Sequence, residues 1–205
     1  MFKQGVSEET SRDLALLGKS GRLGQFYLAG GTACALLLGH RLSFDLDFFT
    51  LKSFSQEELE KSLNKINSFD RDQIAPDTLL GIFGRTKVSF FRYDYPLISK
   101  TNLFLNVKIA GLPDLSAMKI DAISRRGVKR DFIDLFFICQ KLSLKKSFKN
   151  YKKKFKHKNI NFVHAIKALN YFADADKEKL PEMLIKCDWK KVKDFFIKET
   201  PKLLR

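Results

Sequence analysis

Two short motifs, separated by one predicted helix, carry the residue types that chemistry on a nucleoside triphosphate requires. The first is Gly30-Gly31-Thr32, and the second is the pair Asp45 and Asp47. Glycines lack a Cβ, so phosphate oxygens can approach their backbone N–H groups, and a helix that begins there adds the positive end of its dipole. Two carboxylates at alternate positions of a strand project from the same face, where they offer the hard oxygen ligands that Mg²⁺ or Mn²⁺ prefers. We therefore predict a metal site at Asp45 and Asp47 that serves nucleotidyl transfer from an NTP.

The order of elements around these motifs supports their functional interpretation. Taken singly, a Gly-Gly pair is typical of a turn, and an Asp-x-Asp pair is typical of a solvated strand face. Here residues 25–29 are predicted to form a short buried strand that stops at the glycines, and residues 32–38 a helix. Residues 43–50 then alternate polar and apolar side chains, as a strand with one buried face does. Because the helix is short, we expect the glycines and the aspartates to meet at the same end of this unit.

Three polar residues stand beside the carboxylates. Arg41 precedes the strand, and we predict that it neutralises triphosphate charge. His40 either binds a base or simply ends the helix. Ser43 shares the face of the carboxylates, where it either contacts a phosphate or is a plain polar strand residue. Arg41 and Ser43 thus join the predicted nucleotide-binding group.

The rest of the chain predicts an α+β fold, with a mixed sheet first and helices after it. Residues 69–106 are rich in strand patterns, with strands expected at 78–83, 87–93 and 103–108. Helical patterns follow at 113–124 and 130–142, and further helices are expected near Phe162 and from Trp189. We therefore expect an α/β core over residues 1–110 and a basic helical part over residues 111–205.

Composition and charge narrow the class of protein. Of the 205 residues, 44% are hydrophobic and 30% charged, which indicates a folded globular chain, and the formal charge of +15 favours an anionic partner. The three cysteines, Cys34, Cys139 and Cys187, form no CxxC pair, which argues against a zinc knuckle or a disulfide framework. The sequence has no apolar run long enough to span a bilayer and no apolar export segment near its start. We expect a cytoplasmic protein with no membrane partner.

A lysine-rich segment without acidic residues follows the second of these helices. Its lysines are Lys145, Lys146, Lys149, Lys152, Lys153, Lys154, Lys156 and Lys158. Three aromatic residues are interleaved at helical spacing: Phe148, Tyr151 and Phe155. We expect the aromatic residues to seat a helix on the core while the lysines face outward. An outward lysine surface suits RNA phosphates, so we predict RNA binding at Lys152, Lys153 and Lys154. The alternative is a solvated lysine face that only keeps a basic protein in solution.

Three segments carry a resemblance to a known family. Residues 26–49 contain FYLAGGTA and LGHRLSFDLDFF, residues 119–126 read KIDAISRR, and residues 129–135 read KRDFIDL. A weaker match, ALNYFADA, spans residues 168–175. The segments resemble nucleotidyltransferase toxins of the AbiEii/AbiGii type, within the DNA polymerase β-like superfamily. The resemblance implies a polymerase β-like core, transfer of NMP from an NTP to RNA (tRNA in particular) with release of pyrophosphate, and a cognate antitoxin as partner.

The resemblance also assigns roles to single residues. It implies that the triphosphate is held by Gly30, Gly31 and Thr32. It further implies that Asp45 and Asp47 bind metal and that Lys119, which would otherwise read as a snorkelling surface residue, contacts nucleotide phosphate. An aspartate of the KRDFIDL segment would complete the site, and we favour Asp134 as catalytic and Asp131 as supporting. The alternative for one of the two aspartates is a structural role, with an arginine partner among Arg125, Arg126 and Arg130.

One position departs from the superfamily pattern. A third carboxylate commonly comes from a later strand, and Ser89 stands at the expected position, whereas Asp94 lies further along, at the strand end. The base that deprotonates the acceptor hydroxyl is therefore left open between Asp134 and solvent. Two other functions also stay open: transfer to a protein side chain or a small molecule, and non-catalytic binding of RNA or phosphate on the same fold. The intact pair Asp45 and Asp47 speaks against the non-catalytic alternative.

Overall fold

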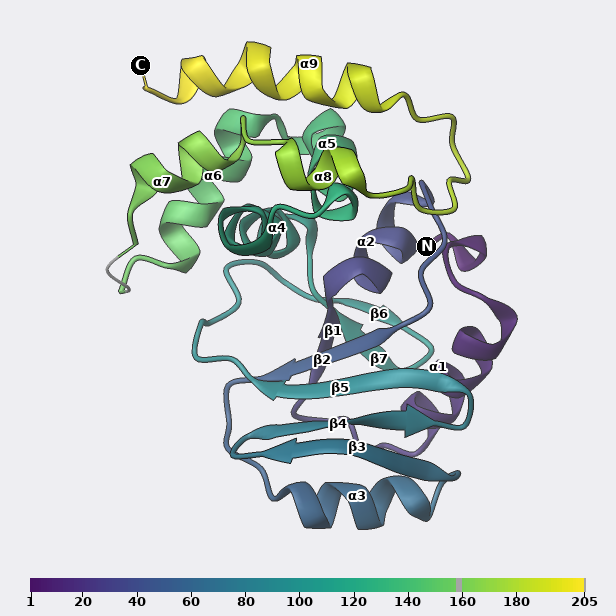
Figure 1. Ribbon diagram of the computed structural model, residues 1–205. Helices are drawn as coiled ribbons and strands as arrows, with labels where there is room; N and C mark the ends of the chain where they lie inside the picture. Colours follow the sequence, from purple (N-terminus) through teal and green to yellow (C-terminus); the bar gives the residue numbers. More distant parts are fainter. Residues whose placement is uncertain (158–159, 205) are drawn as a thin grey trace.

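The strands form one mixed sheet, which Figure 1 shows in its lower half. The computed structural model describes residues 1–157 and 160–204. Within these residues the sheet has seven strands in the order β3-β4-β5-β2-β1-β7-β6. Their bounds are Tyr27–Ala29 for β1, Leu46–Thr50 for β2, Phe69–Ala75 for β3, Thr78–Phe83 for β4, Thr86–Arg92 for β5, Asn102–Phe104 for β6 and Val107–Ile109 for β7.

The central strand β2 holds the second predicted motif between two neighbours. It runs parallel to β5, with Asp47 opposite Ser89, and antiparallel to β1, with Ala29 opposite Asp47. Leu46 and Phe48 on the other face of β2 are fully buried in the core. The alternation of apolar and polar residues therefore places the carboxylate of Asp47 on the face away from that core.

Three helices pack on the first part of the chain. They are α1 (Glu8–Lys19), α2 (Gly30–Leu38) and α3 (Gln56–Asn64), preceded by a 3₁₀ turn at Lys3–Gly5. The Ser7 hydroxyl caps α1 by accepting a hydrogen bond from the Thr10 N–H at 3.1 Å, and the Ser55 hydroxyl caps α3 by accepting one from the Glu58 N–H at 3.2 Å. The apolar faces of these helices and the buried strand residues form one hydrophobic cluster.

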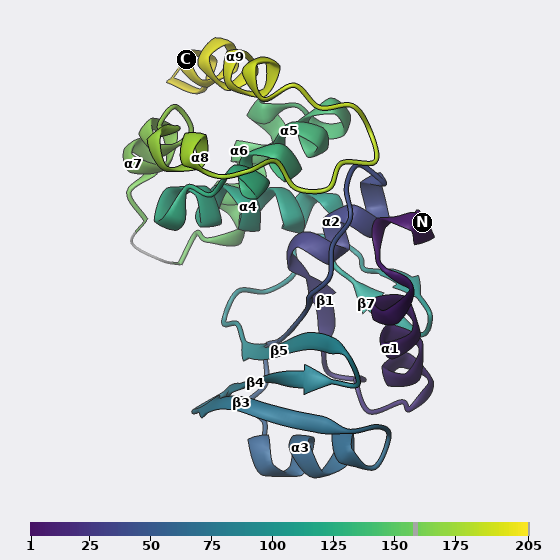
Figure 2. The ribbon, with the colours of Figure 1, turned by 45° about the vertical axis from the view of Figure 1, so that its right-hand side comes forward.

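The second part of the chain is a layer of helices, which Figures 1 and 2 show above the sheet. The helices are α4 (Leu112–Arg126), α5 (Lys129–Leu142), α6 (Leu144–Lys154), α7 (Phe162–Ala168), α8 (Ala173–Lys177) and α9 (Trp189–Glu199), followed by a 3₁₀ turn at Thr200–Leu204. Phe132 on α5 is fully buried in a second hydrophobic cluster, where its ring contacts those of Phe172, Trp189 and Phe196. Because α2 also contacts α4 and α5, it connects the sheet to this layer.

A long connection from the helical layer returns to the end of α2. Between α8 and α9 the chain passes beside residues 40–42, as Figure 1 shows in yellow-green. There the Leu42 N–H donates to the Glu182 carbonyl at 2.8 Å, and the Leu184 N–H donates to the His40 carbonyl at 2.9 Å. Arg41 and Met183 form an antiparallel bridge between these contacts. The backbone on both sides of Arg41 is thereby fixed.

The predicted α+β class is confirmed, and several element predictions agree with the structure. The strand expected at 78–83 is β4, and the helix expected from Trp189 is α9. The strand expected at 103–108 is wrong, because Leu105 and Asn106 adopt left-handed φ angles of 49° and 62° and turn the chain between β6 and β7. In the described part of the chain, no helix is long and apolar enough to cross a membrane.

Candidate active site

The glycine motif forms the first turn of α2, and each glycine lies against a functional side chain. Gly30 has a φ of 69°, and a Cβ there would stand 2.5 Å from Asp47 Oδ2. A Cβ on Gly31 would stand 2.6 Å from Arg41 Nη2. The helix expected from Thr32 therefore begins at Gly30, with the first free N–H groups at the glycines themselves. Only glycine allows this turn to sit so close to both side chains.

Thr32 and Ser43 connect the glycine turn to the carboxylate segment. The Thr32 hydroxyl donates to the Asp45 carbonyl and lies 2.9 Å from Ser43 Oγ. Thr32 is 1% exposed, so its contacts are with protein atoms. Ser43, Asp45 and Asp47 lie on one side of the segment, although β2 begins only at Leu46.

A cavity of about 280 Å³, which we call the central cavity, collects most of the predicted residues. Its wall includes these predicted residues: Gly30, Gly31, Arg41, Ser43, Asp45, Asp47 and Lys119. A second cavity of about 320 Å³ adjoins it, and we call it the aromatic cavity because Phe49, Phe91 and Tyr93 line it. Asp131 belongs to the wall of the aromatic cavity. Among the described residues, the walls of both cavities leave out Thr32 and Asp134.

The positive charge near Asp47 does not fully offset the burial of its carboxylate and the repulsion from Asp45. Burial raises the pKa of Asp47, the nearby charge of Asp45 raises it further, and Lys119 and a hydrogen bond with Ser89 offset part of the rise. A divalent cation between the two carboxylates would remove this repulsion. The part of the chain that the structure describes has no group of three or more His, Cys, Asp or Glu residues placed to hold a metal. Two carboxylates and a serine hydroxyl still fit Mg²⁺, which takes one or two carboxylates and fills its other positions with phosphate and water.

Lys119 on α4 is held between two aspartates of α5. Its Nζ lies 2.8 Å from Asp131 Oδ1 and 2.6 Å from Asp134 Oδ2. Burial acts to lower the pKa of Lys119, but the two carboxylates outweigh it and raise the pKa above its ordinary value. Lys119 is 5% exposed and lines both cavities, so it presents a fixed, permanent positive charge to them.

Asp134 lies behind the cavities and organises the cations around it. The residue is fully buried. Its Oδ1 accepts a hydrogen bond from Arg41 Nε and lies 2.7 Å from His40 Nε2. Its Oδ2 accepts a hydrogen bond from Arg41 Nη2. Burial acts to raise the pKa of Asp134, but Lys119, Arg41 and His40 hold it well below its usual range. His40 is fully buried in this network, away from any base-binding surface.

The first part of the chain matches a known family. A model of the nucleotidyl transferase AbiEii toxin family, of a type IV toxin–antitoxin system, matches residues 12–109. An uncharacterised protein of Aquifex aeolicus is 38% identical over 205 residues, which cover 97% of this chain and 98% of the relative. The chain belongs to the AbiEii nucleotidyltransferase toxin family. It is therefore a nucleotidyltransferase.

Solved structures share the fold of this AbiEii-family enzyme. MenT4, a nucleotidyltransferase toxin from Mycobacterium tuberculosis, aligns with a TM-score of 0.58 at 14% identity and covers 96% of this chain and 82% of its own. A nucleotidyltransferase structure from Helicobacter pylori aligns with a TM-score of 0.52 at 17% identity and covers 97% of both chains. At these identities the alignments support the fold alone.

The AbiEii-family site also contains residues that the sequence did not assign to nucleotide binding. Lys87, Arg126 and Arg130 add positive charge to the wall of the central cavity. Arg126 also pairs with Asp131, and its Nε lies 2.8 Å from Asp131 Oδ2. This is one of the three arginine pairings that the sequence left open. Arg126 and Arg130 lie within the matching segments KIDAISRR and KRDFIDL. The direction of their side chains depends on the turn at Gly127 between α4 and α5.

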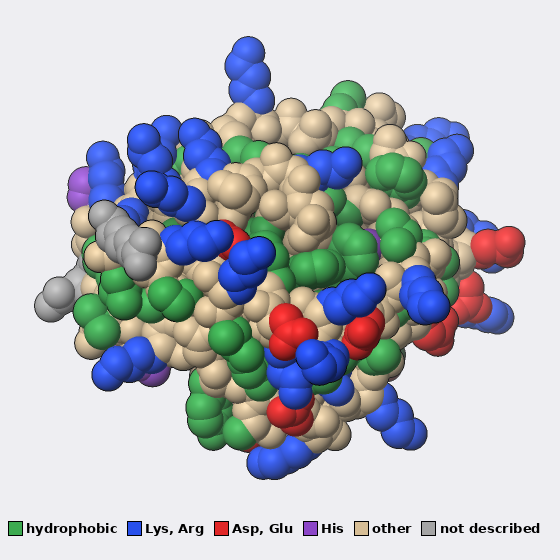
Figure 3. Space-filling view, turned by 90° about the horizontal axis from the view of Figure 1, so that it is seen from above, with side chains coloured by type: hydrophobic (Ala, Val, Ile, Leu, Met, Phe, Trp, Pro, Cys, Tyr) green, Lys and Arg blue, Asp and Glu red, His purple; other side chains and the backbone are tan. Residues whose placement is uncertain are grey.

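The lysine-rich segment is α6 and the residues after it, and it follows the prediction with one exception. The interleaved aromatic residues Phe148, Tyr151 and Phe155 are buried, and Lys152 and Lys153 are exposed. The expectation that Lys154 faces outward is wrong: it is 2% exposed, and its Nζ lies 2.8 Å from Asp114 Oδ1. Lys158 lies outside the described residues. Figure 3 shows Lys and Arg side chains gathered at the upper left of the view from above, with few acidic ones beside them.

Proposed function

We propose that this enzyme transfers NMP from an NTP to a hydroxyl of RNA, with tRNA as the acceptor and Mg²⁺ or Mn²⁺ as the required metal. One observation carries the proposal: the Asp45 and Asp47 carboxylates share one cavity with the first turn of α2 and with Lys119. That combination provides ligands for a cation, N–H donors for phosphate oxygens and a positive charge for the leaving group.

The metal would be held by Asp45 and Asp47. When bound there, it would supply positive charge to the triphosphate and to the attacking oxygen. The residues fit this assignment because burial, and after it the nearby charge of Asp45, raises the pKa of Asp47, so the two carboxylates lie close to each other. Ser89, opposite Asp47 on β5, occupies the place of a third carboxylate and hydrogen-bonds with Asp47.

The other residues of the cavity bind and orient the triphosphate. Gly30 and Gly31 offer backbone N–H groups at the positive end of α2. Arg41 and Lys119, which both line the central cavity, meet the phosphate oxygens. These cations stabilise the negative charge that grows on the departing pyrophosphate.

The transfer exchanges one phosphorus–oxygen bond for another. The oxygen of the acceptor hydroxyl forms a bond to the α-phosphorus, and the bond from that phosphorus to the bridging oxygen breaks. Pyrophosphate leaves with the electron pair of the broken bond. We assign the hydroxyl proton to solvent water, because Asp134 is fully buried behind Arg41 and Lys119 and both of its oxygens already contact cations.

The assignment of RNA as acceptor rests on charge. The chain carries a formal charge of +15, and exposed lysines including Lys152 and Lys153 lie on α6. A small acceptor needs no broad cationic surface, whereas RNA does. Because NTPs and tRNA are both cytoplasmic, we place the reaction in the cytoplasm. As a member of a type IV toxin–antitoxin family, the enzyme is expected to have a cognate antitoxin.

One transfer experiment tests this proposal. The purified protein would be incubated with Mg²⁺ and each of the four NTPs in turn, labelled at the α-phosphate, together with total RNA, tRNA, a protein extract or small-molecule acceptors. The proposal predicts label in the RNA fraction, chiefly in tRNA, and loss of that label on chelation of the metal. Label in the protein or small-molecule fraction would overturn the acceptor assignment, and the absence of label everywhere would overturn catalysis.

A further inference from the structure

A third hollow, of about 400 Å³, lies between α4 and α7 beside the cavities described above. Its wall includes Ser124, Arg125, Arg126, His164, Lys167 and Tyr171, and we call it the outer groove. We propose that the outer groove binds the single-stranded end of the RNA acceptor, with a base stacked on Tyr171 and phosphates at Lys167 and Arg125. This inference rests on the proposed function, because it names where the acceptor of that reaction lies.

The outer groove is continuous with the site through two arginines. Arg126 lines the outer groove, the aromatic cavity and the central cavity, and Arg125 lines the first two. Arg126 is fixed by its ion pair with Asp131, which also holds Lys119. A strand seated in the groove therefore passes Arg126 and reaches the cavity that contains Asp45 and Asp47.

The groove combines an exposed aromatic ring with uncompensated positive charge. Tyr171 is 58% exposed although it lines a hollow. Lys167 has no ion-pair partner among residues 1–157 and 160–204, whereas Arg125 and Arg126 are paired with Asp121 and Asp131. Aromatic rings beside cations are how proteins bind single-stranded nucleic acid, because bases stack on the ring while phosphates meet the charges.

Side-chain contacts hold the walls of the outer groove in place. His164 Nε2 donates a hydrogen bond to the Ser124 carbonyl at 3.0 Å, which joins α7 to the end of α4 and fixes the imidazole. One acidic residue, Asp174, also lines the hollow, and Lys177 pairs with it at 3.3 Å. A hollow of about 400 Å³ is the size of a small-ligand pocket, which suits a short single strand better than a duplex.

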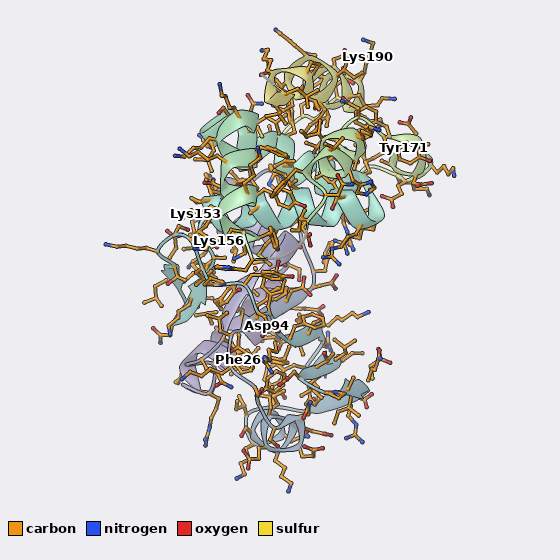
Figure 4. All side chains as sticks on the ribbon, turned by 90° about the vertical axis from the view of Figure 1, so that its left-hand side faces the viewer. Phe26, Asp94, Lys153, Lys156, Tyr171 and Lys190 are labelled. Carbon is orange, nitrogen blue, oxygen red and sulfur yellow. The ribbon has the colours of Figure 1, made fainter. Side chains whose placement is uncertain are left out.

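The groove is distinct from the lysine-rich surface of α6. Figure 4 shows Lys153 and Lys156 on one side of the helical layer and Tyr171 on the opposite side. Lys152 on α6 lies over the rings of Phe148 and Phe162, at 5.2 Å and 5.5 Å, away from the cavities. Of these two surfaces, the outer groove is the one that shares wall residues with the site, so it suits the reacting end of the RNA.

The test compares three groove variants by RNA binding and by turnover. Tyr171→Ala should weaken binding of a short fluorescein-labelled single-stranded RNA by roughly 5- to 150-fold, the cost of one lost base stack. Tyr171→Phe retains the ring and should bind as the wild type does. Lys167→Gln should lower the slope of log affinity against log salt by about 0.7, as the loss of one single-strand phosphate contact does. In the transfer reaction, Tyr171→Ala should raise the KM for RNA and leave kcat and the affinity for NTP unchanged.

Two outcomes separate this inference from the proposed function. If Tyr171→Ala and Lys167→Gln bind the single-stranded RNA as tightly as the wild type, the outer groove is not the acceptor site, even when transfer to RNA occurs. If the variants lose binding but the wild type transfers no nucleotide to RNA, the groove binds RNA and the proposed reaction is wrong. A duplex RNA that competes as well as the single strand would also contradict the inference.

Discussion

Asp134 on α5 receives two hydrogen bonds from the guanidinium of Arg41, from Nε at 2.7 Å and from Nη2 at 2.9 Å. The two contacts fix the plane of the guanidinium, because a fork of two donors meets both carboxylate oxygens. The same Nη2 lies only 2.6 Å from the position that a Cβ on Gly31 would take. Asp134 also contacts Lys119. We infer that Asp134 acts in the AbiEii-family enzyme as a positioning residue, which directs two cations at the triphosphate.

The substitution Asp134→Asn should therefore lower both stability and activity. It leaves Arg41 and Lys119 buried with one carboxylate fewer, a change that typically costs about 3–5 kcal/mol for a buried ion pair. Urea unfolding would measure the loss. The control is Asp94→Asn, because Asp94 pairs with Arg92 on the surface, where such pairs contribute only about 0–1 kcal/mol. Equal stability of the two variants would contradict a central role of Asp134 in the network.

The same substitution should change the acid dependence of stability. The folded-state pKa of Asp134 lies well below its ordinary value, so its charged form stabilises the fold above about pH 4. That contribution is lost as the pH falls through the depressed folded-state pKa. Asp131, whose pKa is also lowered, behaves in the same way. The free energy of unfolding of Asp134→Asn should thus fall less steeply below about pH 4 than that of the wild type.

The glycine turn can be tested by adding a side chain. Gly31→Val should weaken NTP binding, because the new side chain would collide with Arg41, which Asp134 holds in place, and would cover the backbone N–H groups. Calorimetric titration with a non-hydrolysable NTP measures the affinity directly. Gly24→Ala is the matched control, since an added Cβ there meets only the Gly21 carbonyl, at 3.9 Å. Unchanged affinity in Gly31→Val would indicate a turn with a purely structural role.

Removing the Lys119 ammonium should reduce turnover more than substrate binding. Lys119→Ala deletes a positive charge that we place beside the leaving pyrophosphate, and loss of one such group typically costs about 100- to 1,000-fold in kcat. Steady-state kinetics with NTP and RNA would show the effect as a lower kcat. The exposed Lys87 lines the same cavity, and its change to Ala should cost much less, because no carboxylate fixes it among the described residues. Equal effects of the two changes would argue against a specific role for Lys119.

Neighbouring lysines on α6 should respond differently to the same substitution. The double change Lys152→Gln and Lys153→Gln should flatten the salt dependence of RNA binding by up to about 0.9 per lost duplex phosphate contact, with little effect on unfolding. Lys154→Gln should instead destabilise the fold, because it breaks the buried pair with Asp114. An unaltered salt slope in the double variant would contradict RNA binding at these exposed lysines and favour a solvated face that only keeps the protein in solution.

Local pattern was sufficient to predict the elements that carry the proposed metal site. The alternation after Ser43 places Asp47 opposite the buried Leu46 and Phe48, and the position expected for a third carboxylate, Ser89, lies directly beside Asp47 in the parallel register. The family motifs also predicted Lys119 as a site residue, and it lines the central cavity. These features depend on strand period and on short connections, which the sequence displays.

Contacts between distant segments could not be predicted in the same way. The period of α6 gives Lys154 the same spacing as exposed lysines, and only the position of Asp114 on α4 explains its burial. Similarly, Asp131 and Asp134 share one helical face. Their surroundings differ because Arg41, at the end of α2, contacts Asp134. The return of residues 178–188 to that end is likewise a long-range contact without a local signal. β3 was missed as a separate strand because most of its residues are exposed and polar.

The most direct test of the metal site is nucleotide transfer by Asp45→Asn and Asp47→Asn. With labelled NTP, Mg²⁺ and RNA, the wild type should label RNA, and each variant should lose at least about 100-fold in rate. The variants should fold as well as the wild type or better, because removing one carboxylate relieves the repulsion that raises the pKa of Asp47. Circular dichroism and thermal unfolding would verify this. Transfer near the wild-type rate by either folded variant, at the same Mg²⁺ concentration, would contradict the assignment of Asp45 and Asp47 as the metal site of this nucleotidyltransferase.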